Sequence, residues 1–172
     1  KKGRGLICLT AHFGNWELAG AVLTALGYSV HAVVLPQRMQ KLNKLLQHQR
    51  ESRGLKLIPV GDSARGIIRC LKRGEIVAML SDRDFTQRND LIPFFGKPAR
   101  IPLGPAWMSF KMNTPILPCL LLRQEDDTFL FRFYSPLLPE KEGSVEALRK
   151  RICEFMEKEI GERPYQWFIF QD

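Results

Sequence analysis

Apolar residues follow two alternating patterns along the first half of the chain. Short apolar runs predict buried strands, and segments with apolar residues three or four positions apart follow them, as in amphipathic helices. The predicted strands are 6–10, 30–35, 57–60 and 76–80, and the predicted helices are 15–26, 39–53 and 63–73, the last capped by Asp62 or Ser63. Glycines follow the three helices directly. This alternation predicts an α/β fold with helices flanking a largely parallel central sheet.

The second half of the chain predicts a different arrangement. Residues 81–100 have little periodicity and form the longest irregular stretch, and a helix is predicted over 102–112. Strands are predicted over 116–122 and 128–134, and the Asp126-Asp127 turn between them favours antiparallel pairing. A helix capped by Ser144 and an aromatic tail that packs on the body follow, at 144–160 and 164–170. We see no domain boundary and expect a single domain over 1–172.

Charge and cysteine content narrow the possible partners and compartment. The chain has 26 Lys and Arg against 18 Asp and Glu, a net charge of +8, which favours anionic partners such as lipid headgroups, phosphorylated cofactors, an acidic carrier protein or nucleic acid. The basic residues are dispersed, unlike a nucleic-acid-binding tail. Four cysteines lie far apart without a C-x-x-C pair, which predicts buried free thiols in a reducing compartment.

Several kinds of active site lack their sequence signature. The glycines have neither dinucleotide-binding nor P-loop spacing, and no serine, threonine or cysteine lies in a nucleophile elbow. His31 and His48 lack metal-ligand spacing, so we expect no metal. The chemistry that remains is direct: a base deprotonates a hydroxyl or amine, which then attacks an activated acyl group.

The stretch TAHFGNWELAG, residues 10–20, contains the candidate base. Residues five apart in a regular helix are rotated by about 140°, so His12 and Glu17 can meet only if His12 lies in a turn before the helix. Gly14 permits that bend, and Asn15 is a candidate N-cap. Glu17 would then orient the imidazole of a general base. Alternatively, Glu17 complements the helix dipole and His12 is partly buried.

Three segments follow predicted strands, where reactive groups gather in open α/β sheets. They are 12–17, 36–38 and 81–100. We expect the candidate site at this carboxyl edge of the sheet.

The residues of these segments resemble a known family. HFGNWE resembles the H-x-x-x-x-(D/E) motif of the glycerolipid acyltransferase superfamily, and its GNWE form is similar to that of the late acyltransferases of bacterial lipid A biosynthesis, the lauroyl and myristoyl transferases. The similarity continues, in the family's order, through RESRG (50–54), LKRGEIVAMLSDRD (71–84), IPFFGKPARIPLGPAWMSFKMNTPILP (92–118) and PYQWF (164–168).

The resemblance implies roles for individual residues and an acyltransferase-like fold. His12 would be the general base and Glu17 its orienting partner. The implied substrate-binding residues are Asn15, Arg50, Asp82, Arg83, Phe95 and Gly96, with Arg50 binding an anionic group. For Asp82, a structural role as hydrogen-bond acceptor is the favoured interpretation. For Phe95, hydrophobic packing under a loop is favoured over contact with an acyl chain.

The resemblance also implies a reaction and a location. The expected reaction moves a fatty acyl group from an acyl carrier protein or coenzyme A thioester, a co-substrate rather than a cofactor, to a hydroxyl of a lipid A precursor or related membrane glycolipid. The expected location is the cytoplasmic face of the bacterial inner membrane, in peripheral contact with anionic lipid. We expect 1–172 to be the catalytic domain of a longer protein, without its N-terminal membrane anchor.

Other functions remain open from the sequence. A glycerophospholipid or phosphatidylinositol mannoside acyltransferase would share the same chemistry with another acceptor. A non-catalytic protein that binds anionic membranes, or a nucleic-acid-binding module, would explain the charge alone.

Overall fold

A six-stranded sheet forms the centre of the computed structural model, which describes residues 5–37, 39–60, 63–84 and 90–168. The strand order is β3-β2-β4-β1-β7-β8. The strands are β1 (Leu6–Thr10), β2 (Val30–Val34), β3 (Lys56–Pro59), β4 (Ile76–Leu80), β7 (Ile116–Arg123) and β8 (Phe129–Phe133). All neighbours pair in parallel except β7 and β8, which are antiparallel. The predicted α/β class and its antiparallel pair are confirmed.

The predicted helices form close to their predicted bounds. They are α1 (Trp16–Ala25), α2 (Gln40–Glu51), α3 (Ser63–Lys72), α4 (Gly104–Met112) and α6 (Val145–Glu162). Asn15 caps α1, since its Oδ1 accepts from the Leu18 N–H at 3.0 Å. Ser144 caps α6, since its Oγ accepts from the Ala147 N–H at 3.0 Å. The caps predicted at Asn15 and Ser144 are therefore confirmed. Of the two alternatives for α3, Ser63 is its first helical residue, and Asp62 lies outside the described residues. Residue 38 of the predicted segment 36–38 also lies outside them.

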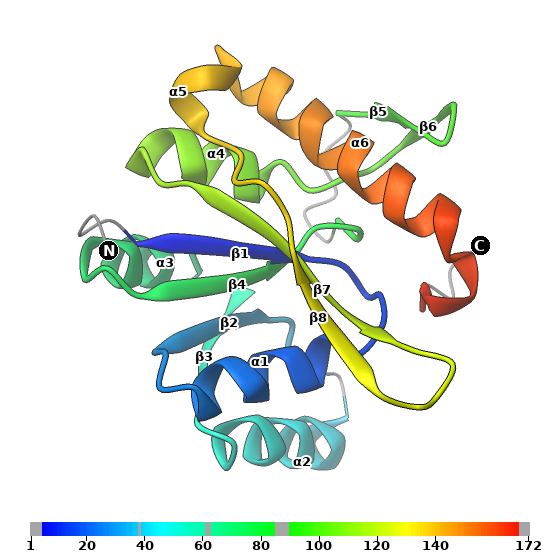
Figure 1. Ribbon diagram of the computed structural model, residues 1–172. Helices are drawn as coiled ribbons and strands as arrows, with labels where there is room; N and C mark the ends of the chain where they lie inside the picture. Colours follow the sequence, from blue (N-terminus) through cyan, green and yellow to red (C-terminus); the bar gives the residue numbers. More distant parts are fainter. Residues whose placement is uncertain (1–4, 38, 61–62, 85–89, 169–172) are drawn as a thin grey trace.

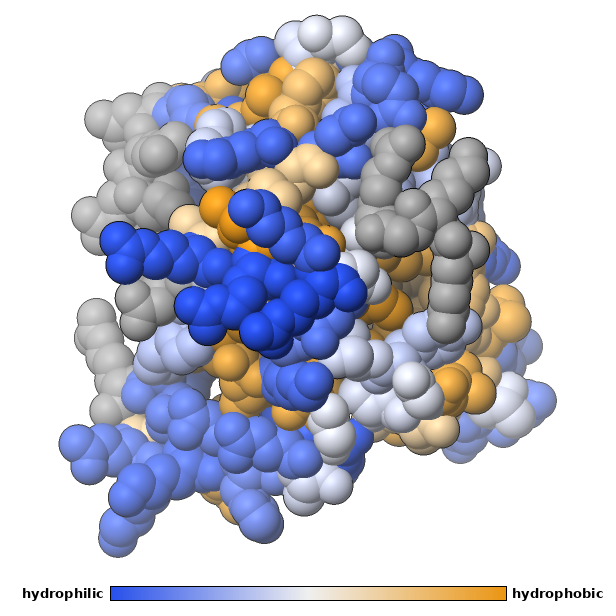
Figure 2. All heavy atoms as spheres, turned by 90° about the vertical axis from the view of Figure 1, so that its left-hand side faces the viewer, coloured by the Kyte–Doolittle hydropathy of each residue, from blue (hydrophilic) through white to orange (hydrophobic). Residues whose placement is uncertain are grey.

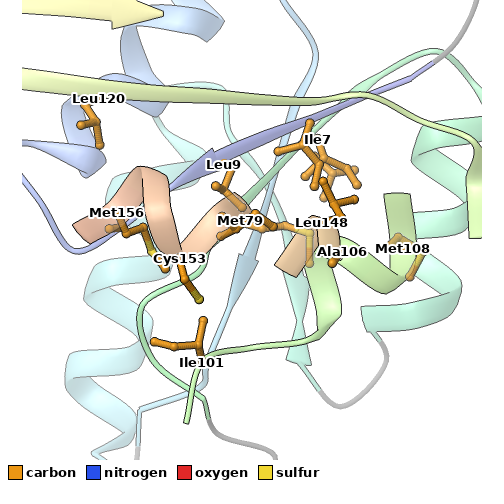
Figure 3. Packing of buried hydrophobic residues seen from close by; sticks show 14 of the residues in the cluster. Ile7, Leu9, Met79, Ile101, Ala106, Met108, Leu120, Leu148, Cys153 and Met156 are labelled. Carbon is orange, nitrogen blue, oxygen red and sulfur yellow. The ribbon is translucent and has the colours of Figure 1, made fainter. Parts of the chain in front are cut away.

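The helices cover the two faces of the sheet. Figure 1 shows α1 and α2 on one side and α4 and α6 on the other. The larger buried cluster joins β1 and β4 to α3, α4 and α6, and the side chains in Figure 3 include Leu9, Met79, Ala106, Leu148 and Met156 from these elements. A smaller cluster, containing Leu23 of α1, lies on the other face. Burial on both faces explains why the parallel strands are almost continuously apolar.

The stretch 81–100 differs from its prediction. It contains an antiparallel hairpin of β5 (Ile92–Phe94) and β6 (Lys97–Ala99), turned by Phe95 and Gly96, which have positive φ angles of 50° and 72°. Three-residue strands are too short to show periodicity, so the sequence pattern did not reveal them. The short helix α5 (Pro139–Glu142) and the 3₁₀ turn Pro164–Gln166 were missed for the same reason.

The cysteines are buried and free, as predicted. Cys8 of β1 and Cys119 of β7 lie on neighbouring strands with their Sγ atoms 2.8 Å apart. None of the described helices combines the length and the apolar character that a bilayer crossing requires.

Candidate active site

Strand register brings His12 next to Asp82. Thr10, the last residue of β1, pairs with Leu80, the last residue of β4, and the two polar residues each lie two positions further on. The His12 Nδ1 lies 3.0 Å from Asp82 Oδ1, and the His12 backbone N–H donates to Asp82 Oδ2 at 2.8 Å. Asp82 therefore fixes both the ring and the backbone of His12 at the carboxyl edge of the sheet.

Asp82 is held in turn by the C-terminal segment. Its side chain is fully buried, and the Trp167 indole N–H donates to Oδ2 at 3.0 Å. Three N–H groups thus converge on one buried carboxylate, which offsets the cost of removing it from water and restricts its orientation. Asp82 is therefore a hydrogen-bond acceptor for the His12 loop, the His12 ring and the C-terminal segment.

The bend after β1 depends on Gly14. Its φ is +59°, and a Cβ at this position would lie 2.2 Å from the Leu121 carbonyl oxygen. The Gly14 N–H donates to the Gln166 carbonyl at 2.9 Å, and the Phe168 N–H donates to the His12 carbonyl at 2.7 Å. The loop that carries His12 is therefore held between β7 and the C-terminal segment.

Glu17 has a different partner from the one predicted. Arg50 of α2 donates from Nε to Glu17 Oε2 at 3.0 Å and from Nη2 to Oε1, which gives a two-pronged ion pair. The prediction that Glu17 orients His12 is corrected, because Asp82 holds that position. The helical spacing took account only of local neighbours, whereas the actual partner of His12 comes from the adjacent strand.

A cavity of about 670 Å³ opens beside these groups. Its wall is mostly apolar, with side chains from α1, the carboxyl ends of β2 and β4, and α4. The polar and charged side chains include His12, Glu17, Arg50 and Arg83. Trp16 also lines the cavity and packs edge-to-face on His12, with ring centroids 5.2 Å apart. The imidazole, 25% exposed, is thus accessible from an apolar cavity that also contains cations.

Some of the remaining predicted site residues line the cavity, and the others lie outside its wall. Arg50 and Arg83 line the cavity, whereas the Asn15 side chain caps α1. Phe95 and Gly96 form the tip of the β5–β6 hairpin and are not part of the described cavity wall. The Phe95 ring packs near Trp167, with centroids 6.4 Å apart, so it supports the residue that holds Asp82.

Sequence reasoning missed the role of Trp167. Its segment was noted, but only the chain path shows that the tail reaches the end of β1, where Trp167 and Phe13 form an isolated antiparallel bridge. A buried indole N–H requires an acceptor. That requirement is the signal that could have linked Trp167 to a carboxylate.

The whole chain matches one known protein family. The model of the bacterial lipid A biosynthesis acyltransferase family matches residues 1–172. The chain belongs to this family. In this chain, the HFGNWE and LSDRD segments contain His12 and Asp82, the two residues that the strand register brings together.

The chain is also similar to individual acyltransferases, at 26–27% identity. The chain is 26% identical over 175 residues to a phosphatidylinositol mannoside acyltransferase of Mycobacterium tuberculosis, covering 98% of this chain and 54% of that protein. The corresponding protein of Mycolicibacterium smegmatis is 26% identical over 176 residues, 98% of this chain and 56% of its own length. The lipid A biosynthesis palmitoleoyltransferase of Escherichia coli is 27% identical over 171 residues, 96% of this chain and 54% of its own. The chain thus spans about half the length of the curated relatives it matches.

Proposed function

We propose that the chain catalyses transfer of a fatty acyl group from a thioester to a hydroxyl of a membrane glycolipid. The observation that carries this proposal is the imidazole of His12, which lines the cavity while Asp82 binds its Nδ1. With Nδ1 donating its proton to the carboxylate, Nε2 is the unprotonated nitrogen that can accept one. Nε2 makes no hydrogen bond within the described part of the chain.

The reaction needs one base and no covalent enzyme intermediate. Nε2 of His12 accepts the proton of the acceptor hydroxyl, and the oxygen attacks the thioester carbonyl carbon. A C–O bond forms, the C–S bond breaks, and the leaving thiolate takes the proton from the imidazolium. Asp82 acts as a positioning residue that stabilises the transient positive charge on the ring.

The start of α1 offers donors for the negative charge that develops on the carbonyl oxygen. The Phe13, Gly14 and Asn15 backbone N–H groups are occupied by other carbonyls. The first-turn N–H groups of Trp16 and Glu17 have no backbone partner among the described residues, and both residues line the cavity. Preorganised amides at a helix N-terminus are suited to such an oxyanion.

The apolar part of the cavity suits the acyl chain. Its volume falls in the range of about 300–1,000 Å³ that is typical of ligand sites. Each CH₂ group removed from water contributes about 0.8 kcal/mol, so an apolar wall is the main source of affinity for a fatty acyl group. Leu23, Val34 and Met108 are among the wall residues.

Arg50 supplies positive charge on the same wall. Glu17 holds its guanidinium at two points, and the Arg50 side chain is 21% exposed. We assign Arg50 to an anionic group of a substrate, either the phosphates of the glycolipid or those of the carrier's prosthetic group or coenzyme A. Glu17 then positions Arg50 rather than His12.

Two acceptor classes follow from the relatives. The names of those relatives refer to lipid A biosynthesis and to phosphatidylinositol mannoside. Both lipids are glycolipids, so we propose a lipid-linked sugar hydroxyl as the shared acceptor. A glycerophospholipid is the alternative. The net charge of +8 supports peripheral binding to anionic lipid, which we place at the cytoplasmic face of the inner membrane.

The test measures acyl transfer from labelled acyl carrier protein and acyl-coenzyme A to the three acceptor classes in separate assays. We expect turnover with a glycolipid acceptor and a fall of about 100-fold or more for His12→Ala, the range expected for loss of a general base. His48→Ala, at an exposed position of α2, is the matched control and should retain turnover. Unchanged turnover in His12→Ala would refute the proposed chemistry. Binding to anionic vesicles without any acyl transfer would favour a non-catalytic membrane protein.

A further inference from the structure

Three side chains of types that can bind metal ions meet at the amino edge of the sheet, the edge opposite to the one with His12. His31 is the second residue of β2, Cys70 lies in the last turn of α3, and Glu75 directly precedes β4. One potential ligand atom from each residue lies within 4.8 Å of the other two. These residues lie at the amino ends of parallel strands, whereas the cavity with His12 opens at their carboxyl ends.

Two of the ligand atoms form a close, buried ion pair. His31 Nε2 and Glu75 Oε2 lie 3.0 Å apart, but their geometry is not that of a hydrogen bond, and neither atom has another hydrogen-bond partner in the described part of the chain. His31 is only 9% exposed, so water has little access to its ring nitrogen. A cation between the nitrogen and the oxygen would bind both atoms.

From this geometry we infer that His31, Cys70 and Glu75 bind a divalent transition metal ion of the zinc type. Imidazole nitrogen, thiolate sulfur and carboxylate oxygen are all zinc ligands. Tetrahedral zinc holds such atoms about 3.4–3.7 Å apart, as follows from its bond lengths. Small side-chain rotations are therefore enough to form the site, with a water molecule as the fourth ligand.

The charges of the three ligands balance a divalent cation. A divalent cation with one thiolate, one carboxylate and one neutral imidazole is neutral overall. The Cys70 proton is released to solvent when the thiolate binds the metal.

Nearby cations set a limit on affinity. Lys56 and Arg73 both act on His31 electrostatically, and Lys56 donates to Ser29 Oγ at 2.9 Å. Figure 2, which faces this edge of the sheet, shows a strongly hydrophilic surface across the middle of the face. These cations disfavour a site with net positive charge, which makes the thiolate of Cys70 necessary for binding.

The sequence did not reveal this cluster because its ligands come from three elements. His31 and Cys70 are 39 positions apart by their residue numbers (70 − 31), and no short motif links them. The inferred site does not depend on acyl transfer. A bound ion would connect β2, α3 and the turn before β4, and would stabilise the amino edge of the sheet.

The test uses Co²⁺ as a spectroscopic probe of the metal-free protein prepared with a chelator. We expect an equimolar amount of Co²⁺ to produce a sulfur-to-cobalt charge-transfer band, which Zn²⁺ then abolishes by displacement. Cys70→Ser should lose the band, and Glu75→Gln should weaken Co²⁺ binding by about 100-fold or more, as expected for a lost ligand. Cys153→Ser, a change at a buried cysteine of α6, is the matched control and should retain the band.

Thermal unfolding with and without Zn²⁺ provides a measurement that does not depend on the colour of the complex. Zn²⁺ should raise the Tm of the unaltered protein and leave the Tm of Cys70→Ser unchanged. The inference is overturned if equimolar Co²⁺ gives no thiolate band in the unaltered protein. A band that persists in Cys70→Ser would also overturn it, because another thiolate would then be the ligand.

Discussion

Asp82 binds His12 twice, through the ring Nδ1 at 3.0 Å and through the backbone N–H at 2.8 Å. The paired ends of β1 and β4 make this possible, because both residues follow the same register position. Two contacts fix the loop and the ring together. The orientation of the imidazole is therefore a property of the sheet rather than of the HFGNWE segment alone.

Trp167→Phe should reduce activity without abolishing it. The change removes the indole N–H that donates to Asp82 Oδ2 at 3.0 Å and keeps most of the aromatic packing. A hydrogen bond to a charged group contributes about 1.5–3 kcal/mol. We therefore expect the free energy of unfolding to fall by an amount near the lower end of this range. We also expect kcat to fall several-fold. Denaturant unfolding and steady-state kinetics measure the two effects. Phe168→Leu, which removes a neighbouring ring without a donor, is the control, and an equal fall in kcat there would argue against the hydrogen bond.

Arg50→Ala should raise the KM for the anionic substrate more than it lowers kcat. Arg50 lines the cavity but does not contact His12 in the described hydrogen bonds, and its partner is Glu17. A double-mutant cycle with Glu17→Ala should give a coupling of about 1 kcal/mol in stability, since both side chains are partly exposed and solvent screens the pair. Strict additivity of the two substitutions would show that the pair does not act as a unit.

Gly14→Ala should be far more damaging than Gly27→Ala. Both glycines have positive φ angles, which cost an alanine roughly 1–2 kcal/mol. At Gly14 a Cβ would also lie 2.2 Å from the Leu121 carbonyl oxygen, whereas at Gly27 nothing lies within 4 Å. We expect Gly14→Ala to destabilise the protein by several kcal/mol, or to shift the His12 loop and abolish activity. Similar unfolding midpoints for the two variants would contradict this account of the bend.

Stability should fall at alkaline pH because of Tyr134. Burial raises the pKa of its phenol, and Glu159, which accepts its hydrogen bond at 2.5 Å, raises that pKa further. Above pH of about 10, the usual tyrosine value, the unfolded chain loses the proton that the folded protein keeps. The folded state then binds more protons, so the free energy of unfolding decreases as pH rises. Unfolding between pH 8 and 11 should show a smaller decrease for Tyr134→Phe, and the exposed Tyr165→Phe should behave like the unaltered protein.

Much of the fold was predictable because its elements carry strong local signals. The strand at 6–10, the cap at Asn15 and the glycine stops all follow from periodicity and turn chemistry. The position of His12 at the carboxyl edge also followed from the strand before it. The β5–β6 hairpin was not predictable in the same way, because its strands are held mainly by a turn and by packing on α6.

The partners within the site were harder to predict than its location. The pairing of His12 with Asp82 depends on β4 lying beside β1, although β2 and β3 intervene in the sequence. Parallel strand order is a long-range property that no local pattern specifies. Glu17 was the nearest carboxylate in sequence, and only the position of α2 shows that Arg50 occupies it. The same limitation concealed the role of Trp167.

We propose that Asp82, rather than Glu17, positions the catalytic imidazole. The most direct test of this proposal is the single-turnover rate of acyl transfer, with saturating donor and acceptor, for Asp82→Asn and Glu17→Gln measured side by side. We expect Asp82→Asn to lower this rate by about 100-fold or more and Glu17→Gln to lower it far less. The main effect of Glu17→Gln should be a raised KM for the anionic substrate, measured separately in the steady state. A large loss in Glu17→Gln together with a nearly normal rate in Asp82→Asn would show that Glu17, and not Asp82, positions the imidazole.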